Sequence, residues 1–140
     1  MYNARAMRPP THELLDPELC GVPVECSEGR AEVEFVATAR MRADATDLVH
    51  GGFVFGLADH AAMLAVGAPT VVLAGAELKF LAPVVVGDRV RATATTAETS
   101  GKKHLVDVVV RRDDTVVMEA RLTCVVPTRH VLEGGRDARR

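Results

Sequence analysis

An aspartate stands in the middle of an apolar stretch, where an acid is costly to bury. Residues 48–69 read LVHGGFVFGLADHAAMLAVGAP, and Asp59 and His60 are flanked on both sides by apolar residues. A carboxylate that is removed from water either shifts its pKa or finds a partner. The pattern leaves two interpretations. Asp59 is a catalytic or ligand-binding acid, or it turns to the surface or bonds a buried polar group.

The same stretch predicts a helix with a nearly bare face around this acid. At helical spacing Asp59 shares its face with Gly52, Gly56 and Met63. Each glycine costs a helix about 1 kcal/mol relative to alanine. Close packing of another backbone would explain the bare face, and so would a ligand beside the carboxylate; the sequence is compatible with both.

The start of the helix has no side-chain cap. His50, Gly51 and Gly52 occupy the positions where Ser, Thr, Asn or Asp is usual. The first amides of a helix have no intrahelical acceptor and lie at its positive end. Such donors suit a carbonyl oxygen that becomes an oxyanion. The alternative is a glycine-rich turn whose amides are satisfied by water or a neighbouring loop.

Composition argues against several classes of function. A formal net charge of −2 and a pI near 6.2 give no support for a nucleic-acid partner. Cys20, Cys26 and Cys124 lack a C-x-x-C spacing, and the histidines lack the spacing of metal ligands, so we expect free thiols and no metal. His60 is expected to be structural or at the surface. The start of the chain lacks the apolar run of a signal peptide, and residues 53–66 are too short to span a bilayer, so we expect a cytoplasmic protein with no membrane partner.

The rest of the chain predicts a sheet that holds this helix. The helix stops at Gly67 and Pro69, and the hydrophobic period then changes to two. Short turns between consecutive strands imply an antiparallel sheet, and a helix that is apolar nearly all round must be buried by it. The sequence therefore predicts the α+β class, with strands at 31–38, 71–81, 88–99, 103–112 and 115–126.

The 140 residues have the usual length of one domain. We expect a flexible N-terminal arm over residues 1–10 and a flexible tail over 132–140. Between the arm and the first strand, THELLDPELCG predicts a short helix that is capped by Thr11 and ended by Gly21.

The segment HGGFVFGLAD, with Asp59 nine positions after His50, resembles the hotdog-fold acyl-CoA thioesterases, above all the phenylacetate-pathway group. The segment FLAPVVVGDRV at 80–90 resembles the one that follows their second strand. The resemblance covers most of the chain, residues 31–126. It implies a five-stranded antiparallel sheet wrapped around one long central helix, in homodimers or dimers of dimers. It implies no cofactor, because the coenzyme A is part of the substrate.

The resemblance also implies roles for particular residues. The amide of Gly51 binds the thioester carbonyl beside Gly52, His50 positions this turn, and Asp59 is the general base on water or the nucleophile. The residues expected to bind substrate are Asp44, Phe53, Gly56 and Met63.

Two positions depart from the family pattern. Asp44 stands where relatives often have Asn, and Asp47 where they often have Gly. If Asp44 lies close to Asp59, like-charge repulsion would raise a pKa.

The spacing of the two key residues predicts a dimer. Gly51 and Asp59 are eight residues apart, which is about 12 Å along a regular helix. A carbonyl donor and a base must both come within about 3–3.5 Å of one reacting group. One helix cannot do both, so we expect Asp59 of a second copy to meet Gly51 of the first at two equivalent interface sites.

Three functions are compatible with this pattern. The first is hydrolysis of a small aryl- or acyl-CoA thioester. The second is a non-catalytic acyl-CoA-binding protein, and the third is an enoyl-CoA hydratase or dehydratase that pairs His50 with Asp59. Candidate contacts for the CoA phosphates, or simply solubilising residues, are Lys102, Lys103, Arg111, Arg112 and Arg129.

Overall fold

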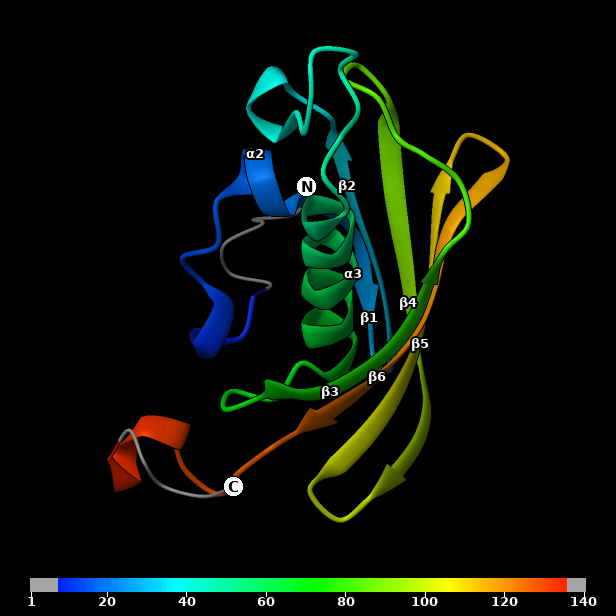
Figure 1. The fold of residues 1–140 in the computed structure, drawn as a ribbon. Helices are drawn as coiled ribbons and strands as arrows, with labels where there is room; N and C mark the ends of the chain where they lie inside the picture. Colours follow the sequence, from blue (N-terminus) through cyan, green and yellow to red (C-terminus); the bar gives the residue numbers. More distant parts are fainter. Residues whose placement is uncertain (1–7, 136–140) are drawn as a thin grey trace.

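One long helix lies across the concave side of a curved antiparallel sheet (Figure 1). The structure is a computed structural model, and it describes residues 8–135. The helix is α3 (Gly51–Val66). The strands are β1 (Val22–Ser27), β2 (Arg30–Val36), β3 (Val72–Phe80), β4 (Arg89–Ser100), β5 (Lys103–Arg112) and β6 (Thr115–Val125). The shorter elements are η1 (Pro10–His12), α2 (Pro17–Cys20), η2 (Ala39–Met41) and η3 (Val131–Gly134).

The order of the strands in the sheet is β1-β2-β4-β5-β6-β3, and every neighbouring pair is antiparallel. Strands β4, β5 and β6 follow one another as hairpins. Strand β3 comes directly after α3 in the chain but lies at the far edge of the sheet, beside β6. In the chain α3 connects the β2 side of the sheet to β3 at the opposite edge, and it crosses the inner face on the way. The predicted α+β arrangement is confirmed.

The sheet has six strands where we expected five. The additional strand is β1, which the sequence does not predict because Pro23 lies within it. Proline cannot donate to a strand ladder, so it is tolerated at an edge or a bulge. Strand β1 is an edge strand, and its register with β2 shifts between Pro23 and Glu25.

The segment before β1 also differs from the expectation. The predicted continuous helix capped by Thr11 is wrong; η1 and α2 are separate, and α2 is capped by Asp16, whose side chain accepts from the amides of Glu18 and Leu19. Pro17 is the reason, because proline has no N–H and favours the first position of a helix. The predicted end at Gly21, where φ is +90°, is correct.

The two chain ends are described only in part. Residues 1–7 of the expected arm and 136–140 of the expected tail lie outside the described residues. Within the described part, Arg8 is buried, and its guanidinium donates to the carbonyls of Leu15 and Gly21 at 2.6 and 3.4 Å. Arg8 thus fastens this segment to the residues that lead into β1.

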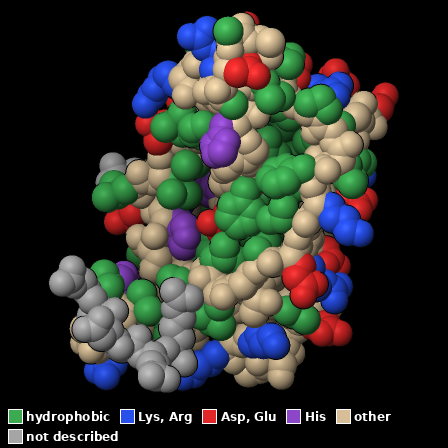
Figure 2. Space-filling model, viewed as in Figure 1, with side chains coloured by type: hydrophobic (Ala, Val, Ile, Leu, Met, Phe, Trp, Pro, Cys, Tyr) green, Lys and Arg blue, Asp and Glu red, His purple; other side chains and the backbone are tan. Residues whose placement is uncertain are grey.

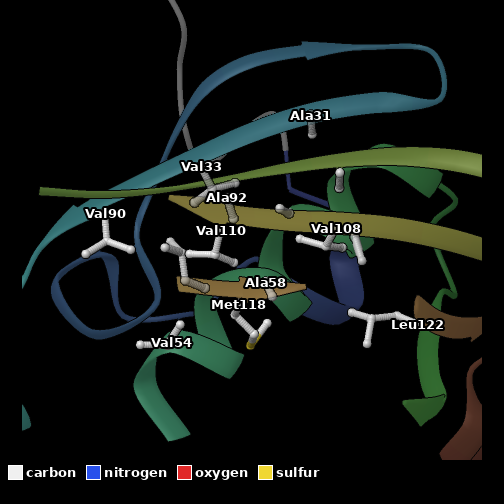
Figure 3. Close-up of a cluster of buried hydrophobic side chains, with 14 of the residues drawn as sticks. Ala31, Val33, Val54, Ala58, Val90, Ala92, Val108, Val110, Met118 and Leu122 are labelled. Atoms are coloured by element: carbon white, nitrogen blue, oxygen red, sulfur yellow. The ribbon is translucent and has the colours of Figure 1, made fainter. Parts of the chain in front are cut away.

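The core lies between α3 and the inner face of the sheet. The alternation read from the sequence is confirmed in β2 and β4, where Val33, Phe35, Val90 and Ala92 are buried, but not in β3, where Phe80 is exposed. Figure 3 shows side chains from β2, β4, β5 and β6 pointing toward Val54 and Ala58 of the helix. Burial of about 25 cal/mol per Å² of apolar surface is the main term that holds α3 in place.

The helix ends as the sequence predicts. Gly67 takes the left-handed conformation at φ +70°, and its amide donates to the carbonyl of Met63 at 2.8 Å. This is the usual glycine stop of a helix. None of the helices in residues 8–135 is long and apolar enough to cross a membrane.

Candidate active site

The first turn of α3 presents two amides without acceptors. His50 is the N-cap residue, with φ −64° and ψ 129° and no side-chain cap. Its carbonyl accepts from the amide of Phe53 at 3.1 Å. Within residues 8–135 the amides of Gly51 and Gly52 have no hydrogen-bond acceptor. These two amides are the unpaired donors that the sequence predicts at the start of the helix.

The loop that leads into this turn is fixed by backbone hydrogen bonds. The amide of His50 donates to the carbonyl of Met41 at 2.9 Å, and the amide of Val49 donates to the carbonyl of Val84 at 2.8 Å. Met41 is fully buried, so its carbonyl is a rigid anchor. The orientation of the first helical amides is therefore set by the core and by the loop after β3.

The departure at Asp47 has a conformational explanation. Asp47 has φ +68°, in the left-handed region where glycine is favoured and Asp is among the better tolerated residues. Its carbonyl accepts from the amide of Val86 at 3.0 Å, which ties this turn to the loop after β3. The left-handed backbone of Asp47 is one that a glycine at this position would also adopt readily.

Asp59 is half-buried, and its Oδ1 atom is buried with no hydrogen-bond partner among residues 8–135. Burial raises the pKa of this carboxyl from 3.8 to about 6. The Asp59 carboxylate also acts on two nearby thiols. Burial and then Asp59 raise the pKa of Cys124 to about 12. Burial raises the pKa of Cys20, with smaller contributions from Asp16 and Asp59. A desolvated carboxylate with a pKa near neutrality suits a general base.

Asp44 does not act on Asp59 in the way we expected. Its Oδ1 accepts from the amide and the hydroxyl of Thr46 at 2.8 and 2.6 Å, and these bonds lower the pKa of Asp44. The rise in the pKa of Asp59 comes from burial. The exposed Asp44 carboxylate is turned into its own loop, so the like-charge effect is absent within the chain.

The residues expected on the bare face differ in their surroundings. A Cβ atom at Gly56 would meet none of the described residues within 4 Å, so this part of the helix is open among them. Phe53 is half-buried, and the His50 ring meets its edge at a centroid distance of 6.2 Å. Met63 is fully buried in the core and offers no surface to a ligand. The expectation that Met63 contacts substrate is corrected, because the turn of α3 that carries it is covered by the rest of the chain.

His60 is a structural residue, one of the two alternatives that the sequence offered. It is buried, and its Nδ1 lies 2.9 Å from the carbonyl of Cys20. A carbonyl only accepts, so Nδ1 carries a proton, and the low pKa of the ring leaves it neutral at pH 7. Burial is the main cause that lowers the pKa of His60 to about 4. The bond joins α3 to the end of α2.

Phe80 was not among the expected site residues. Its ring lies against Gly51: a Cβ atom at Gly51 would be 3.1 Å from Cζ and 3.2 Å from Cε1. The signal that could have found it is the run FLAP at 80–83, an apolar sequence at the end of a strand where polar turn residues are usual. The ring and its neighbours form an apolar pocket beside the helix start.

The free energy of unfolding should depend on pH through the buried carboxyl of Asp59. Because the folded state holds the Asp59 proton more tightly than the unfolded chain, stability falls as pH rises from about 4 to about 6. Each unit of pKa difference is worth about 1.4 kcal/mol, so the ionised carboxylate costs about 3 kcal/mol above that range. Asp59→Asn should therefore raise the free energy of unfolding at pH 8 and change it little at pH 4.

Urea unfolding at a fixed protein concentration, with both proteins at both pH values, measures this difference. An equal effect of the substitution at pH 4 and pH 8 would contradict it.

The family model of the thioesterase superfamily matches residues 47–119, more than half of the chain. The chain belongs to the thioesterase superfamily. The matched segment begins at Asp47 and contains the His-Gly-Gly turn, all of α3 with Asp59, and strands β3 to β5.

Solved structures place this thioesterase-superfamily chain among hotdog folds. An uncharacterized protein, PH1136 from Pyrococcus horikoshii, is 50% identical with a TM-score of 0.86, over 87% of this chain and 94% of that one. The E. coli PaaI protein from the phenylacetic acid degradation operon is 26% identical with a TM-score of 0.68, over 74% of this chain and 81% of that one.

One curated relative is longer. It is the methylthioribose-1-phosphate isomerase of Aquifex aeolicus, 47% identical over 115 residues. These cover 82% of this chain and 25% of that protein, so the chain spans a quarter of the relative's length. The isomerase name describes that whole protein.

The two key features of the site do not meet within one chain. Gly51 opens α3 and Asp59 lies in its middle, on a helix that is continuous from Gly51 to Val66. At 1.5 Å per residue they are about 12 Å apart along the axis. The chain supplies both a carbonyl donor and an acid, but at different places.

Proposed function

We propose that this protein hydrolyses a small aryl- or acyl-CoA thioester. The observation that carries the proposal is the desolvated carboxylate of Asp59, whose Oδ1 has no partner among residues 8–135, on a helix whose first amides lack acceptors in the same part of the chain. A buried acid without a partner costs stability, and a catalytic role accounts for its presence. The chain belongs to the thioesterase superfamily, and hydrolysis of a thioester is a reaction in which such an acid can serve as the base.

In the proposed reaction the Gly51 amide donates a hydrogen bond to the thioester carbonyl oxygen. Asp59 of a second copy takes a proton from water, and the water oxygen bonds to the carbonyl carbon. The C–S bond then breaks, the acyl group leaves as a carboxylic acid, and coenzyme A leaves as the thiolate and takes up a proton. Direct attack by Asp59 gives instead an acyl-aspartyl anhydride that water cleaves to the same products.

Two features support a second copy as the source of the acid. Strand β3 pairs with β6 on one side, and within residues 8–135 its other edge has no neighbouring strand. Figure 2 shows a continuous patch of hydrophobic side chains at the centre of the face that carries α3, with charged side chains mostly around its margin. The edge strand of a sheet and an apolar face are the surfaces that a homodimer would cover.

The likeness to PaaI places aryl-CoA thioesters among the first substrates to test, because the name of that protein refers to phenylacetic acid degradation. Of the candidate phosphate contacts, Arg112 is engaged elsewhere: its Nε lies 3.3 Å from the carbonyl of Pro83 and 3.6 Å from Asp88. Arg111 is exposed and remains a candidate.

A thiol-release assay on a panel of aryl- and alkanoyl-CoA thioesters tests the proposal. We expect release of free CoA thiol with kcat/KM in the usual enzyme range, about 10⁴–10⁸ M⁻¹s⁻¹, for at least one member. Hydration of an enoyl-CoA without thiol release would identify a hydratase. Binding of the thioesters with no turnover would identify a non-catalytic acyl-CoA-binding protein, and either result would contradict the proposal.

A further inference from the structure

The ring of Phe80 lies against Gly51, the residue whose amide is the proposed carbonyl donor. Phe80 is the last residue of β3, and its ring edge lies 3.1–3.7 Å from the Cβ position of Gly51. The side chain is nevertheless 55% exposed in the chain. A large aromatic ring is normally buried, since covering it stabilises a protein by about 1.5–3 kcal/mol.

An apolar pocket begins at this contact. It has a volume of about 370 Å³, and none of the described residues that line it has an ionisable side chain. The residues that line it come from the helix start, from the end of β3 and from the loop that follows: Val49, Gly51, Val54, Phe80, Leu81, Ala82, Pro83 and Val84.

The backbone around the pocket is held in place. Phe80 is paired with the fully buried Met118 of β6, and the amide of Leu81 donates to the carbonyl of Val117 at 2.8 Å. The amide of Val49 donates to Val84 across the other side of the pocket, also at 2.8 Å. The backbone of the walls is therefore fixed by hydrogen bonds, and the exposed Phe80 ring is the lining side chain that lies against Gly51.

We propose that Phe80 determines which acyl groups the site accepts. When the thioester carbonyl is bound to the Gly51 amide, the acyl group enters the adjoining pocket and packs against the Phe80 ring. Among residues 8–135 the side chains that line the pocket include no cation to pair with a charge, so the pocket should favour uncharged aryl or alkyl groups over acyl groups that end in a carboxylate. The inference rests on the proposed function for the nature of the ligand.

The test compares Phe80→Ala and Phe80→Trp with the wild type on short-chain, long-chain and aryl acyl-CoA thioesters. Removing the ring should raise the ratio of kcat/KM for the long chain over the short chain by about tenfold or more, and the larger indole should lower it. Val85→Ala is the matched control, since Val85 is 43% exposed in the same loop but does not line the pocket. A ratio that stays within about twofold in both variants would overturn the inference.

A second measurement separates this inference from the proposed function. Calorimetric binding of S-alkyl-CoA thioethers, which cannot be hydrolysed, reports the same chain-length preference without turnover. If thiol is released but neither preference changes in the Phe80 variants, the inference is wrong and the proposed function stands. If no thiol is released but the thioether preference changes, the proposed function is wrong and the role of Phe80 stands. If the wild type neither cleaves thioesters nor binds thioethers, both are wrong.

Discussion

Asp59→Asn should lower kcat for thiol release by about 10²–10⁴-fold, the usual contribution of a general base. The amide has nearly the shape of the carboxylate but can neither take a proton from water nor attack the carbonyl. The variant should fold at least as well as the wild type, because it lacks the ionised group whose burial raises the pKa of Asp59 to about 6. Steady-state kinetics at pH 8, with unfolding curves for both proteins, measure the two effects.

Glu119→Gln is the matched control, since it makes the same chemical change on the exposed face of β6. It should leave kcat unchanged. Asp59→Ala extends the test by removing the side chain. If thiol release is undiminished in both Asp59 variants, Asp59 has no part in the mechanism.

The wild-type pH profile should agree with this assignment. A base must be ionised to act, so kcat/KM should rise with pH through the raised pKa of Asp59, about 6, and not near the usual value of 3.8.

Most of the fold could be predicted because its signals are local. The period-two alternation of residues such as Val90 and Ala92 identified the strands, and the glycine at position 67 identified the end of α3. Strand β1 was missed because the sequence alone does not show that Pro23 lies at an edge, where the missing amide costs no ladder bond. The helix over residues 11–21 was misjudged because Pro17 acts as a start signal and not as an interior residue.

The sequence predicts those site residues that belong to one element of the chain, and it misses contacts between residues of different elements. Gly51 and Asp59 belong to one helix, so their spacing is visible in the sequence. Phe80 meets Gly51 only because β3 crosses to the far edge of the sheet and ends beside the helix start, a contact between residues far apart in the chain. The engagement of Asp44 with Thr46 is local but depends on a loop conformation that the sequence does not specify.

Gly51→Pro should also lower kcat strongly, because it replaces the N–H donor by the Cδ atom of the proline ring, which cannot donate and takes the place of the hydrogen. Gly51 is the first residue of α3, the position where proline is favoured, and His50 has the extended backbone, φ −64° and ψ 129°, that a following proline requires. Loss of one oxyanion donor typically costs about 10²–10³ in kcat. Circular dichroism and thermal unfolding check that the helix and the fold are retained.

Gly51→Ala is the matched control for crowding. Both substitutions place a Cβ atom about 3.1 Å from the Phe80 ring, an exposed side chain that can move slightly, but alanine keeps the N–H. Activity of Gly51→Ala should stay within about tenfold of the wild type. An equal loss in the two variants would show that space, and not the donor, is what Gly51 provides.

Mixing the two inactive variants then tests where the acid comes from. If each site joins Gly51 of one copy to Asp59 of another, a dimer of one Gly51→Pro chain and one Asp59→Asn chain has one site with both changes and one with neither. Random assortment of co-expressed chains should restore about a quarter of wild-type activity. If both groups came from the same chain, every site would keep one change and no activity would return. Recovery of activity would therefore separate a shared site from a single-chain site, even though both arrangements use the same two residues.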